Sequence, residues 1–354
     1  MTESSTPQSC GFSMPAEWEL HEATWLTWPH NEETWIGYTL DQVKSVYLEM
    51  IAALATGETV NLLVNDEAMQ EKAAKRMVQK QIDLEKIKFF QIPTNDSWVR
   101  DYGPTFLSRE TETGGTETAA TLWKFNAWGN KYDYPLDTKA GKGVLDKIKV
   151  RTFEPELVLE GGSIEVNGQG TLVATRQSLL DPNRNLDIDE NTIEQILKEY
   201  LGVTHIIWCD GQVEGDDTDG HIDNLVRFTD SQTVLALDET NEQDPNHDCI
   251  DKNLKALKKA TDQDGRELNV ISLPTPGLVR EGEERLPASY ANFYIGNNVV
   301  LLPVFDHPND KEAENLLSRI FPDREVIPVN GKVLVSGLGG PHCLTQQQPI
   351  QFDF

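Results

Sequence analysis

Residues 157–173, Leu-Val-Leu-Glu-Gly-Gly-Ser-Ile-Glu-Val-Asn-Gly-Gln-Gly-Thr-Leu-Val, contain the unit from which the fold can be derived. An apolar run over residues 157–159 ends at Glu160 and two glycines, and Asn167-Gly168 then separates two short apolar segments. An Asn-Gly pair between such segments is a strong signal for a tight β-hairpin. The stretch therefore predicts a strand, a polar motif and a hairpin in succession.

Helices and strands alternate along the rest of the chain. Apolar residues at helical spacing run from Val43 to Leu54, Gly57 supplies a stop, and a strand is predicted over residues 60–64. The same helix-then-strand succession is predicted at 67–80 and 87–92, 192–201 and 204–208, 250–260 and 268–273, and 311–320 and 325–329, with a weaker helix at 137–148. A second hairpin signal is Gly296-Asn297. This recurring unit predicts an α/β fold with propeller-like closure rather than a doubly wound sheet.

Polar residues recur with one period. In the sequence, 59 residues separate Asp101 from Glu160, 61 separate Glu160 from His221, and 122, twice 61, separate His221 from Cys343. A missing member of the series is expected near Gly282. Five equivalent positions around one axis would bring residues far apart in the sequence into one site.

The composition limits the classes of partner. The 354 residues include 58 acidic and 31 basic side chains, for a formal net charge of −27. Nucleic acids and anionic lipid surfaces are bound by positive protein surfaces, so the sequence predicts neither as a partner. A small cationic substrate would be attracted by such a field, although the same charge also serves solubility.

We expect a flexible Ser/Thr/Pro-rich tail at residues 1–12 and one catalytic domain at residues 13–354. No stretch approaches the roughly 18 apolar residues of a membrane helix, and the N-terminus lacks a secretion signal, so the cytoplasm is predicted. The four cysteines form no CxxC pair, which predicts neither a disulfide framework nor a zinc knuckle. The sequence leaves the oligomeric state open, a homo-oligomer included.

The segment Gly339-Gly340-Pro341-His342-Cys343-Leu344-Thr345-Gln346-Gln347-Gln348 places a cysteine between glycines and a polar run. Cys343 is either a buried structural cysteine or a nucleophile. As a nucleophile it would act as the thiolate, which requires a cationic neighbour or a bound cationic substrate. The segment alone favours the structural interpretation, and the other motifs reverse it.

Residues 215–224, Gly-Asp-Asp-Thr-Asp-Gly-His-Ile-Asp-Asn, hold four carboxylates and one histidine. In an extended stretch the side chains of His221 and Asp223 point the same way. The motif fits a metal site, a solvated acidic loop, or a proton-transfer site. In the last of these, His221 is the general acid and base while Asp223 holds a cation.

Two further motifs place carboxylates after apolar segments. In residues 95–104, Asp101 follows Arg100, and Trp98 lies three residues before it. A carboxylate suits the fork of a guanidinium, and an indole can lie against the face of that cation, whereas a buried Arg100–Asp101 pair is the structural alternative. Glu160 would orient His221 or bind substrate.

These motifs, in this order, resemble the agmatine deiminases, a bacterial peptidyl-arginine deiminase-like group of the guanidine-modifying superfamily. The resemblance covers nearly the whole chain and is carried by residues 14–18, 25–29, 98–104, 159–163, 181–185, 218–224, 288–294 and 342–348. It implies the pentein fold, a five-bladed α/β propeller with pseudo-fivefold repeats of about sixty residues.

The resemblance also implies roles for matching residues. Cys343 is expected to be the nucleophile, His221 the general acid and base, and Glu160 its partner, while Asp101 and Asp223 grip the guanidinium. No metal or organic cofactor is implied.

Two positions beside this set carry further expectations. Asp217 is expected, like Trp98, to contact the substrate. The chain departs from the family at Pro341, where the usual motif is Gly-Asn-Ile-His-Cys, and proline removes a backbone donor and fixes φ.

The leading hypothesis is hydrolysis of agmatine to N-carbamoylputrescine and ammonia. Free arginine, peptidyl-arginine and amidino transfer are alternatives with the same chemistry. An arginine enzyme needs a cation for the α-carboxylate, and Arg176, Arg184 and Arg280 are candidates. From other classes, the alternatives are an acidic binding module without catalysis and a metal-dependent hydrolase that uses Asp217, Asp219, His221 and Asp223.

Overall fold

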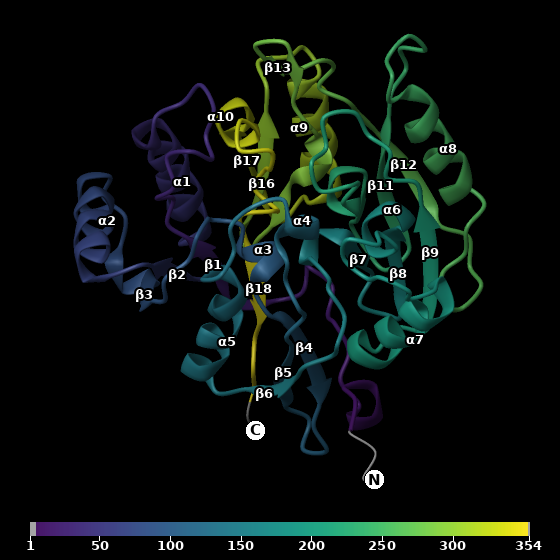
Figure 1. Ribbon diagram of the computed structural model, residues 1–354, viewed down its shortest axis with the longest axis horizontal. Coiled ribbons are helices and arrows are strands. Elements are labelled where there is room, and N and C mark those ends of the chain that lie inside the picture. Colours follow the sequence, from purple (N-terminus) through teal and green to yellow (C-terminus); the bar gives the residue numbers. More distant parts are fainter. Residues whose placement is uncertain (1–4, 353–354) are drawn as a thin grey trace.

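The computed structural model describes residues 5–352, and within that range five sheets of three or four strands follow one plan (Figure 1). In four of them, an antiparallel pair is followed by a helix and a third strand that is parallel to the second. Their strands are β4 (Thr105–Glu110), β5 (Thr116–Thr121) and β6 (Arg151–Phe153); β7 (Ile164–Val166), β8 (Thr171–Thr175) and β9 (His205–Cys209); β10 (Val226–Phe228), β11 (Thr233–Asp238) and β12 (Asn269–Pro274); and β15 (Tyr294–Ile295), β16 (Val299–Val304) and β17 (Glu325–Asn330).

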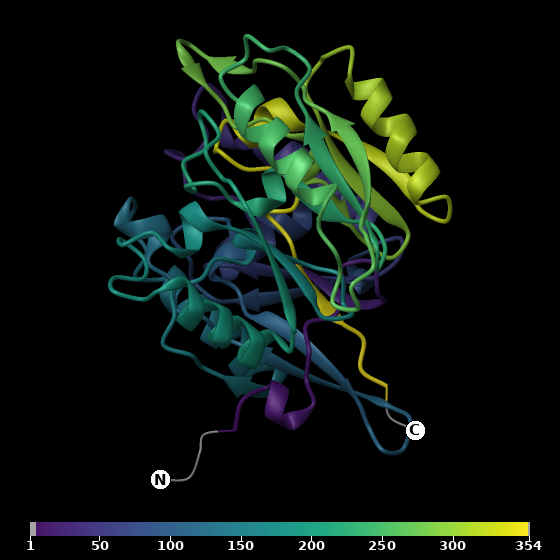
Figure 2. The same ribbon diagram turned by 90° about the vertical axis from the view of Figure 1, so that its right-hand side faces the viewer.

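The fifth sheet joins the two ends of the chain. Its order is β18 (Gln346–Pro349), β1 (His21–Thr27), β2 (Thr59–Val64) and β3 (Ile87–Gln91), with β18 antiparallel to β1 and the others parallel. In the register, Trp25 faces Gln346. Beyond β18 the chain runs beside the hairpin of β4 and β5, where Phe352 pairs with Thr116 (Figure 2).

The connecting helices lie on the outer flanks of the sheets (Figure 1). They are α1 (Leu40–Leu54), α2 (Glu67–Gln79), α5 (Asp137–Ile148), α7 (Glu190–Leu201), α8 (His247–Leu257) and α9 (Asp310–Ile320). Helix α1 begins with a capping box of Thr39 and Gln42, and α7 ends at Gly202 in the left-handed conformation. Apolar side chains of helices and strands pack into buried clusters between the layers. The predicted helix–strand pairs are confirmed, with ends shifted by a few residues.

Short helical turns precede the antiparallel pairs on the inner side. They are α3 (Val99–Tyr102), η3 (Gly161–Ser163), η4 (Ile222–Asn224), η5 (Tyr290–Asn292) and the turn at residues 341–344. Neighbouring turns contact one another from α3 through η3 and η4 to η5. The N–H of His342 donates to the carbonyl of Asn292 (3.2 Å), and the N–H of Arg100 donates to that of Cys343 (3.3 Å). The five turns therefore surround one point.

The expectation that the fifth member of the series lies near Gly282 is wrong. Gly282 is at the tip of an added hairpin, β13 (Arg280–Glu281) and β14 (Glu284–Arg285), and the remaining inner turn is η5, which ends at Asn292. Because this hairpin lengthens one interval, 71 residues separate His221 from Asn292 and only 51 separate Asn292 from Cys343.

Two other expectations also need correction. Residues 157–159 form no strand, only a bridge between Lys124 and Val158. Among the described residues, Leu157 and Leu159 bond to the backbone of Lys124 alone, and both backbone groups of Val158 bond to the Asn185 side chain. In the expected tail, residues 8–10 form the turn η1 (Gln8–Cys10), and the ring of Phe12 is buried in an apolar cluster. Residues 1–4 of that tail lie outside the described residues.

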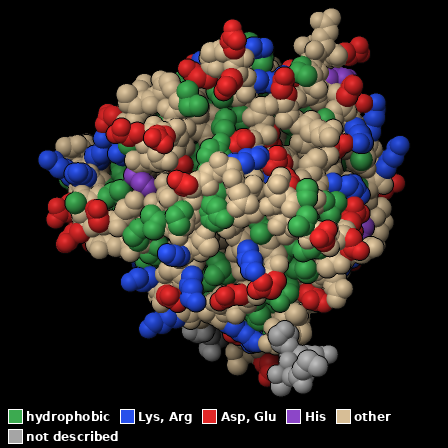
Figure 3. Space-filling model, viewed as in Figure 1, with side chains coloured by type: hydrophobic (Ala, Val, Ile, Leu, Met, Phe, Trp, Pro, Cys, Tyr) green, Lys and Arg blue, Asp and Glu red, His purple; other side chains and the backbone are tan. Residues whose placement is uncertain are grey.

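The remaining elements are short: η2 (Leu84–Lys86), α4 (Ala127–Asn130), α6 (Arg176–Leu179) and α10 (Gly331–Val335). Acidic and basic side chains are interspersed over the face shown in Figure 3. None of the helices within residues 5–352 combines the length and the apolar character that crossing a membrane requires.

Candidate active site

A cavity of about 640 Å³ opens at the inner turns. Cys343, Asp101, Trp98 and Trp128 line it at one end. Its lining also includes five other carboxylates: Glu33, Asp96, Asp133, Asp137 and Asp217. No Lys or Arg stands among the described residues that line it, so the cavity suits a cation.

Cys343 is only 4% exposed. Its Sγ accepts a hydrogen bond from Asn292 Nδ2 (3.1 Å) and donates to Asp223 Oδ2 (3.5 Å). Burial raises the pKa of the thiol well above its usual value, and the charges of Asp223 and Asp101 raise it further. Without a cation nearby, Cys343 is therefore a neutral thiol.

His221 is fully buried between carboxylates. Its Nε2 lies 3.7 Å from Glu160 Oε2 and its Nδ1 lies 3.9 Å from Asp101 Oδ1, so neither ring nitrogen has a hydrogen-bond partner within the described residues. Burial lowers the pKa of His221, but Asp101, Glu160 and Asp223 outweigh burial and raise it to about 9. At neutral pH the ring is an imidazolium with both nitrogens available.

Glu160 is held by a buried arginine. Both carboxylate oxygens accept from Arg184 Nε, at 2.9 and 3.0 Å. Burial acts to raise the pKa of Glu160, yet the nearby His221 and the bonds and charge of Arg184 prevail and lower it. The expected placement of Glu160 beside His221 is thus present, and Arg184 fixes its orientation.

Asp101 is oriented by two donors. The N–H of Gly162 donates to Oδ1 (2.9 Å), and Trp128 Nε1 donates to Oδ2 (3.0 Å). Burial raises the pKa of Asp101, and His221 is the largest opposing influence. Arg100 does not form the expected alternative pair with Asp101; it reaches Glu17 instead (3.3 Å).

Gly162 permits the close approach of the charged groups. A Cβ at this position would lie 2.4 Å from His221 Nδ1, 3.0 Å from Asp223 Oδ2 and 3.1 Å from Asp101 Oδ1. Three polar atoms therefore converge around one glycine, and any side chain there would displace them.

Asp223 has two distinct carboxylate oxygens. Oδ2 accepts from His342 Nδ1 (2.7 Å) and from the Cys343 thiol, whereas Oδ1 is buried with no hydrogen-bond partner in the described residues. Burial acts to raise the pKa of Asp223, but the bond and charge of His342 prevail and lower it. Oδ1 is thus a buried acceptor of an ionised carboxylate, without a donor among the described residues.

Two residues of the candidate site, Asn292 and Trp128, were not predicted from the sequence. Asn292 donates to the thiol and accepts from the backbone N–H of His342 (3.1 Å) with its Oδ1. Asn292 belongs to residues 288–294, one of the motifs that carry the family resemblance, and this motif is the sequence signal that could have indicated it. Trp128 lies in α4, where the four residues from Ala127 to Asn130 all have left-handed φ, a conformation that no local pattern predicts.

The turn at Pro341 has partners for the N–H groups that follow it. Asn292 Oδ1 accepts from the N–H groups of His342 (3.1 Å) and Cys343 (3.4 Å). A Cβ on Gly340 would lie 2.6 Å from that same oxygen. Gly340, the residue before Pro341, therefore leaves room for the Asn292 side chain.

The four residues that a metal-dependent hydrolase would use, Asp217, Asp219, His221 and Asp223, do not lie together. Asp219 pairs with Lys131 (2.9 Å) and Arg184 (2.8 Å), and Asp217 accepts from Tyr132 (2.6 Å). His221 and Asp223 are instead buried at the inner turns. Across residues 5–352, no group of three or more His, Cys, Asp or Glu side chains is arranged to hold a metal ion.

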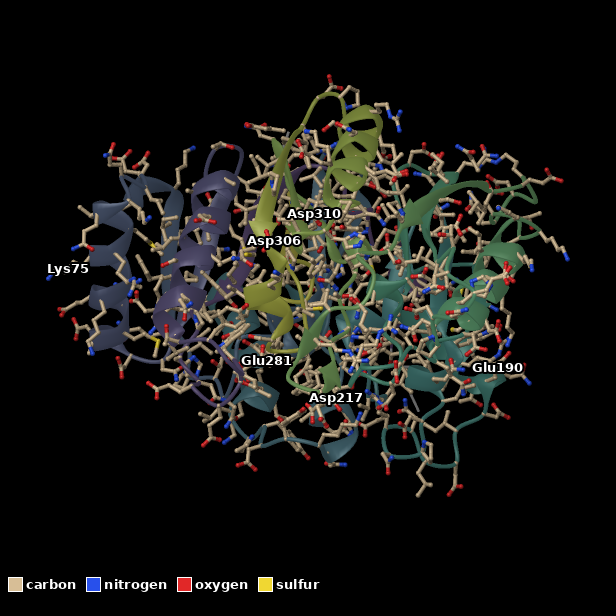
Figure 4. The ribbon with its side chains drawn as sticks, turned by 90° about the horizontal axis from the view of Figure 1, so that it is seen from above. Lys75, Glu190, Asp217, Glu281, Asp306 and Asp310 are labelled. Carbon is tan, nitrogen blue, oxygen red and sulfur yellow. The ribbon has the colours of Figure 1, made fainter. Side chains whose placement is uncertain are left out.

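Of the expected substrate contacts, Trp98 and Asp217 both line the cavity. Trp98 packs against Trp35, with 5.4 Å between the ring centroids, and over Gly339. Figure 4 shows Asp217 on the same side of the molecule as Glu281 of the added hairpin. Asp217 is already engaged with Lys131 and Tyr132, so it contributes less free charge than its neighbours.

The three arginines considered for an α-carboxylate are engaged elsewhere. Arg176 pairs with Glu190, Arg184 with Glu160 and Asp219, and Arg280 with the carbonyl of Glu283. None of the three lines the cavity.

Known proteins share both sequence and structure with this chain. Residues 13–349 match the family described as Porphyromonas-type peptidyl-arginine deiminase. The agmatine deiminase of Ectopseudomonas mendocina is 34% identical over 98% of each chain. The solved agmatine deiminase of Enterococcus faecalis has a TM-score of 0.90 at 29% identity over 98% of both chains. A cysteine-to-serine variant of C. jejuni agmatine deiminase with substrate bound gives 0.85 at 29% identity over 97% of both chains.

Proposed function

Because the chain belongs to the Porphyromonas-type peptidyl-arginine deiminase family, we propose that it is an agmatine deiminase that hydrolyses agmatine to N-carbamoylputrescine and ammonia. The observation that carries the choice of substrate is the lining of the cavity. The described lining contains the Cys343 thiol and six carboxylates, and no Lys or Arg is among it to bind an α-carboxylate. Agmatine is a guanidinium with an amine tail and lacks that carboxylate.

The guanidinium is held by Asp101 and Asp223. Asp223 Oδ1 has no donor, and each carboxylate oxygen accepts more than one hydrogen bond, so Asp101 keeps capacity beside its bonds to Gly162 and Trp128. Two carboxylates on one planar cation fix both its position and its plane.

The bound cation activates Cys343. In the free site the pKa of the thiol is raised by burial and by the charges of Asp223 and Asp101. A guanidinium between these carboxylates cancels their charge and stabilises the thiolate beside it. The nucleophile therefore forms when substrate is present, as the thiol releases its proton to solvent through the cavity that Cys343 lines.

His221 transfers protons in both halves of the reaction. Thiolate attack on the guanidinium carbon forms a C–S bond, and the imidazolium gives a proton to the departing ammonia as the C–N bond breaks. The neutral ring then takes a proton from a water that attacks the S-alkylthiouronium, and breakage of the C–S bond releases the ureido product. A pKa of about 9 for His221 supplies the imidazolium needed first.

We further propose that the five sheets are the blades of a pentein propeller and that residues 13–354 form one catalytic domain. The common plan of the sheets, the pairing of β18 with β1 and the ring of inner turns support this arrangement. The cytoplasmic location and a homo-oligomeric state stay predictions.

The test is steady-state ammonia release from agmatine, free arginine and a peptidyl-arginine substrate in parallel. We expect agmatine to give the highest kcat/KM, because an α-carboxylate would enter a cavity of like charge. A preference for arginine or peptidyl-arginine would contradict the substrate assignment while leaving the chemistry intact.

A further inference from the structure

His342 precedes the nucleophile in sequence, but its ring does not line the cavity. The side chain is 2% exposed. Its Nδ1 lies 2.7 Å from Asp223 Oδ2, and its Nε2 lies 2.9 Å from Glu17 Oε2. Each ring nitrogen of His342 therefore lies within hydrogen-bond distance of a carboxylate, so the ring is held from both sides.

Glu17 comes from the segment before β1, far from the other site residues in sequence. Besides His342, it binds Arg227 Nη2 (2.7 Å), Arg100 Nη2 (3.3 Å) and the backbone N–H of Ile295 (2.9 Å). A buried carboxylate with four partners on different segments has one fixed orientation. Glu17 is thus a rigid anchor behind His342.

The Asp223 carboxylate is where this anchoring acts on the site. If its Oδ2 were free, the group could turn about its last side-chain bond and present either oxygen to the thiol or to the cavity. The bond from His342 engages Oδ2, which leaves the donor-free Oδ1 as the oxygen available to a ligand.

We propose that Glu17 and His342 are positioning residues for the reaction. Glu17 fixes the ring of His342, and His342 fixes the Asp223 carboxylate so that its Oδ1 is left for the substrate guanidinium. The inference rests on the proposed function, because it assigns Asp223 to the guanidinium.

The surrounding charges support this assignment. Burial acts to raise the pKa of Glu17, and Arg227, His342 and Arg100 prevail and lower it well below its usual value. Across the site, Asp223 is also faced by His221. Arg227, which binds Glu17, also donates from its Nε to Glu165 Oε2 (3.0 Å). Removing the charge of Glu17 therefore leaves His342 with a single carboxylate.

The test is Glu17→Gln, assayed with agmatine. We expect KM to rise roughly tenfold, with a smaller change in kcat, as for other outer partners of a site residue. With His342 less firmly held, the bond that lowers the pKa of Asp223 weakens, so the acid limb of kcat/KM should move up by about one pH unit. Calorimetric binding of agmatine to Cys343→Ala, with and without Glu17→Gln, should show the same loss of affinity without turnover.

Glu58→Gln is the matched control. Glu58 is a buried carboxylate that binds the N–H of Asn297 (2.7 Å) and His21, and it does not line the cavity. It should leave KM and the acid limb unchanged. Melting temperatures of both variants separate a loss of fold from a loss of positioning.

Two substitutions of His342 give a second test that does not depend on Glu17→Gln folding. An asparagine can place its amide near the position of Nδ1, and a glutamine near that of Nε2. His342→Asn, which keeps a donor for Asp223, should therefore bind agmatine more tightly than His342→Gln. Equal affinities for the two, or a Glu17→Gln enzyme with unchanged KM and pH profile, would overturn the proposal. An unmodified enzyme that releases no ammonia from agmatine would instead refute the proposed function.

Discussion

The turn that carries Cys343 and the end of β9 that carries Cys209 differ in what surrounds their thiols, not in burial. Cys209 is 2% exposed and Cys343 is 4% exposed. In both cases burial is the largest cause of a raised thiol pKa, to about 12 for Cys209. Cys209 packs with Ile222 and Leu225 in an apolar cluster, whereas Cys343 contacts Asn292 and Asp223 and borders the cavity.

A raised thiol pKa therefore neither identifies nor excludes a nucleophilic cysteine. Cys209 does not line the cavity, and burial outweighs the opposing charge of Arg176, so its thiol stays neutral. Beside Cys343, the charges of Asp223 and Asp101 raise the thiol pKa. In the mechanism that we propose, these two carboxylates also bind the cation that stabilises the thiolate, so they suppress reactivity before binding and promote it afterwards.

The largest expected difference between the two regions is in turnover. Cys343→Ala should lower kcat by at least about a thousandfold, because no other group can form the covalent intermediate. Cys209→Ala should keep kcat within about twofold and lose roughly 1 kcal/mol of unfolding free energy through a small cavity. Ammonia release and urea denaturation measure the two effects. Comparable turnover by the two variants would remove Cys343 from the mechanism.

The second effect concerns the partner of the imidazole. Glu160 helps raise the pKa of His221, so Glu160→Gln should move the basic limb of kcat/KM, near pH 9, to lower pH. Loss of the orienting carboxylate should also reduce kcat roughly a hundredfold. Glu165→Gln is the matched control, since that buried carboxylate pairs with Arg227 and not with a histidine. A basic limb that stays in place in Glu160→Gln would contradict the assigned pairing.

Alkylation by iodoacetamide compares the two thiols directly. Cys343 should react at least about tenfold faster than Cys209, because only Cys343 borders the cavity. Its rate should rise with pH across the alkaline range, because burial raises its pKa. Agmatine should protect Cys343 and leave Cys209 unchanged, which mass spectrometry of the peptides can follow. Equal labelling of both cysteines would remove the distinction drawn here.

The sequence predicted the features that repeat along the chain and those that depend on neighbouring residues. Helix–strand pairs such as residues 43–54 and 60–64 follow from apolar periodicity, because each element must bury one face. The shared period placed Glu160 and His221 in one site, since equivalent positions of a repeat face the same point. The period could not place Asn292, because the added hairpin at Arg280–Arg285 lengthens one interval.

Other parts of the site had no local signal. Trp128 reaches Asp101 through a left-handed segment, and such a conformation is stabilised by tertiary contacts, not by propensity. Glu17 meets His342 only after the ends of the chain have come together beside β1. Long-range ion pairs of this kind depend on the completed fold, and a single sequence contains no pattern for them.

Asp137 extends the comparison from thiols to carboxyl groups. Like the two cysteines it is buried, and no ion pair joins it to a Lys or Arg within residues 5–352. Burial raises its pKa to about 7, against opposing bonds from the N–H groups of Asn95 and Asp96. Between about pH 4 and pH 7 the folded state therefore holds a proton that the unfolded state has released, so this group's contribution to stability falls as the pH rises.

Asp137→Asn should remove this pH-dependent cost. The amide oxygen of the substituted side chain can keep the bond from the N–H of Asn95 (2.7 Å in the unmodified protein), and an amide carries no charge that would need a buried counter-ion. We expect the variant to gain on the order of 1 kcal/mol of unfolding free energy over the unmodified protein at pH 8, and little at pH 4. Urea denaturation at both pH values measures the gain, with Asp133→Asn at an exposed position as the control for net charge. A gain that is the same at both pH values would mean that Asp137 is ionised throughout, and burial without a cation would then not suffice to protonate it.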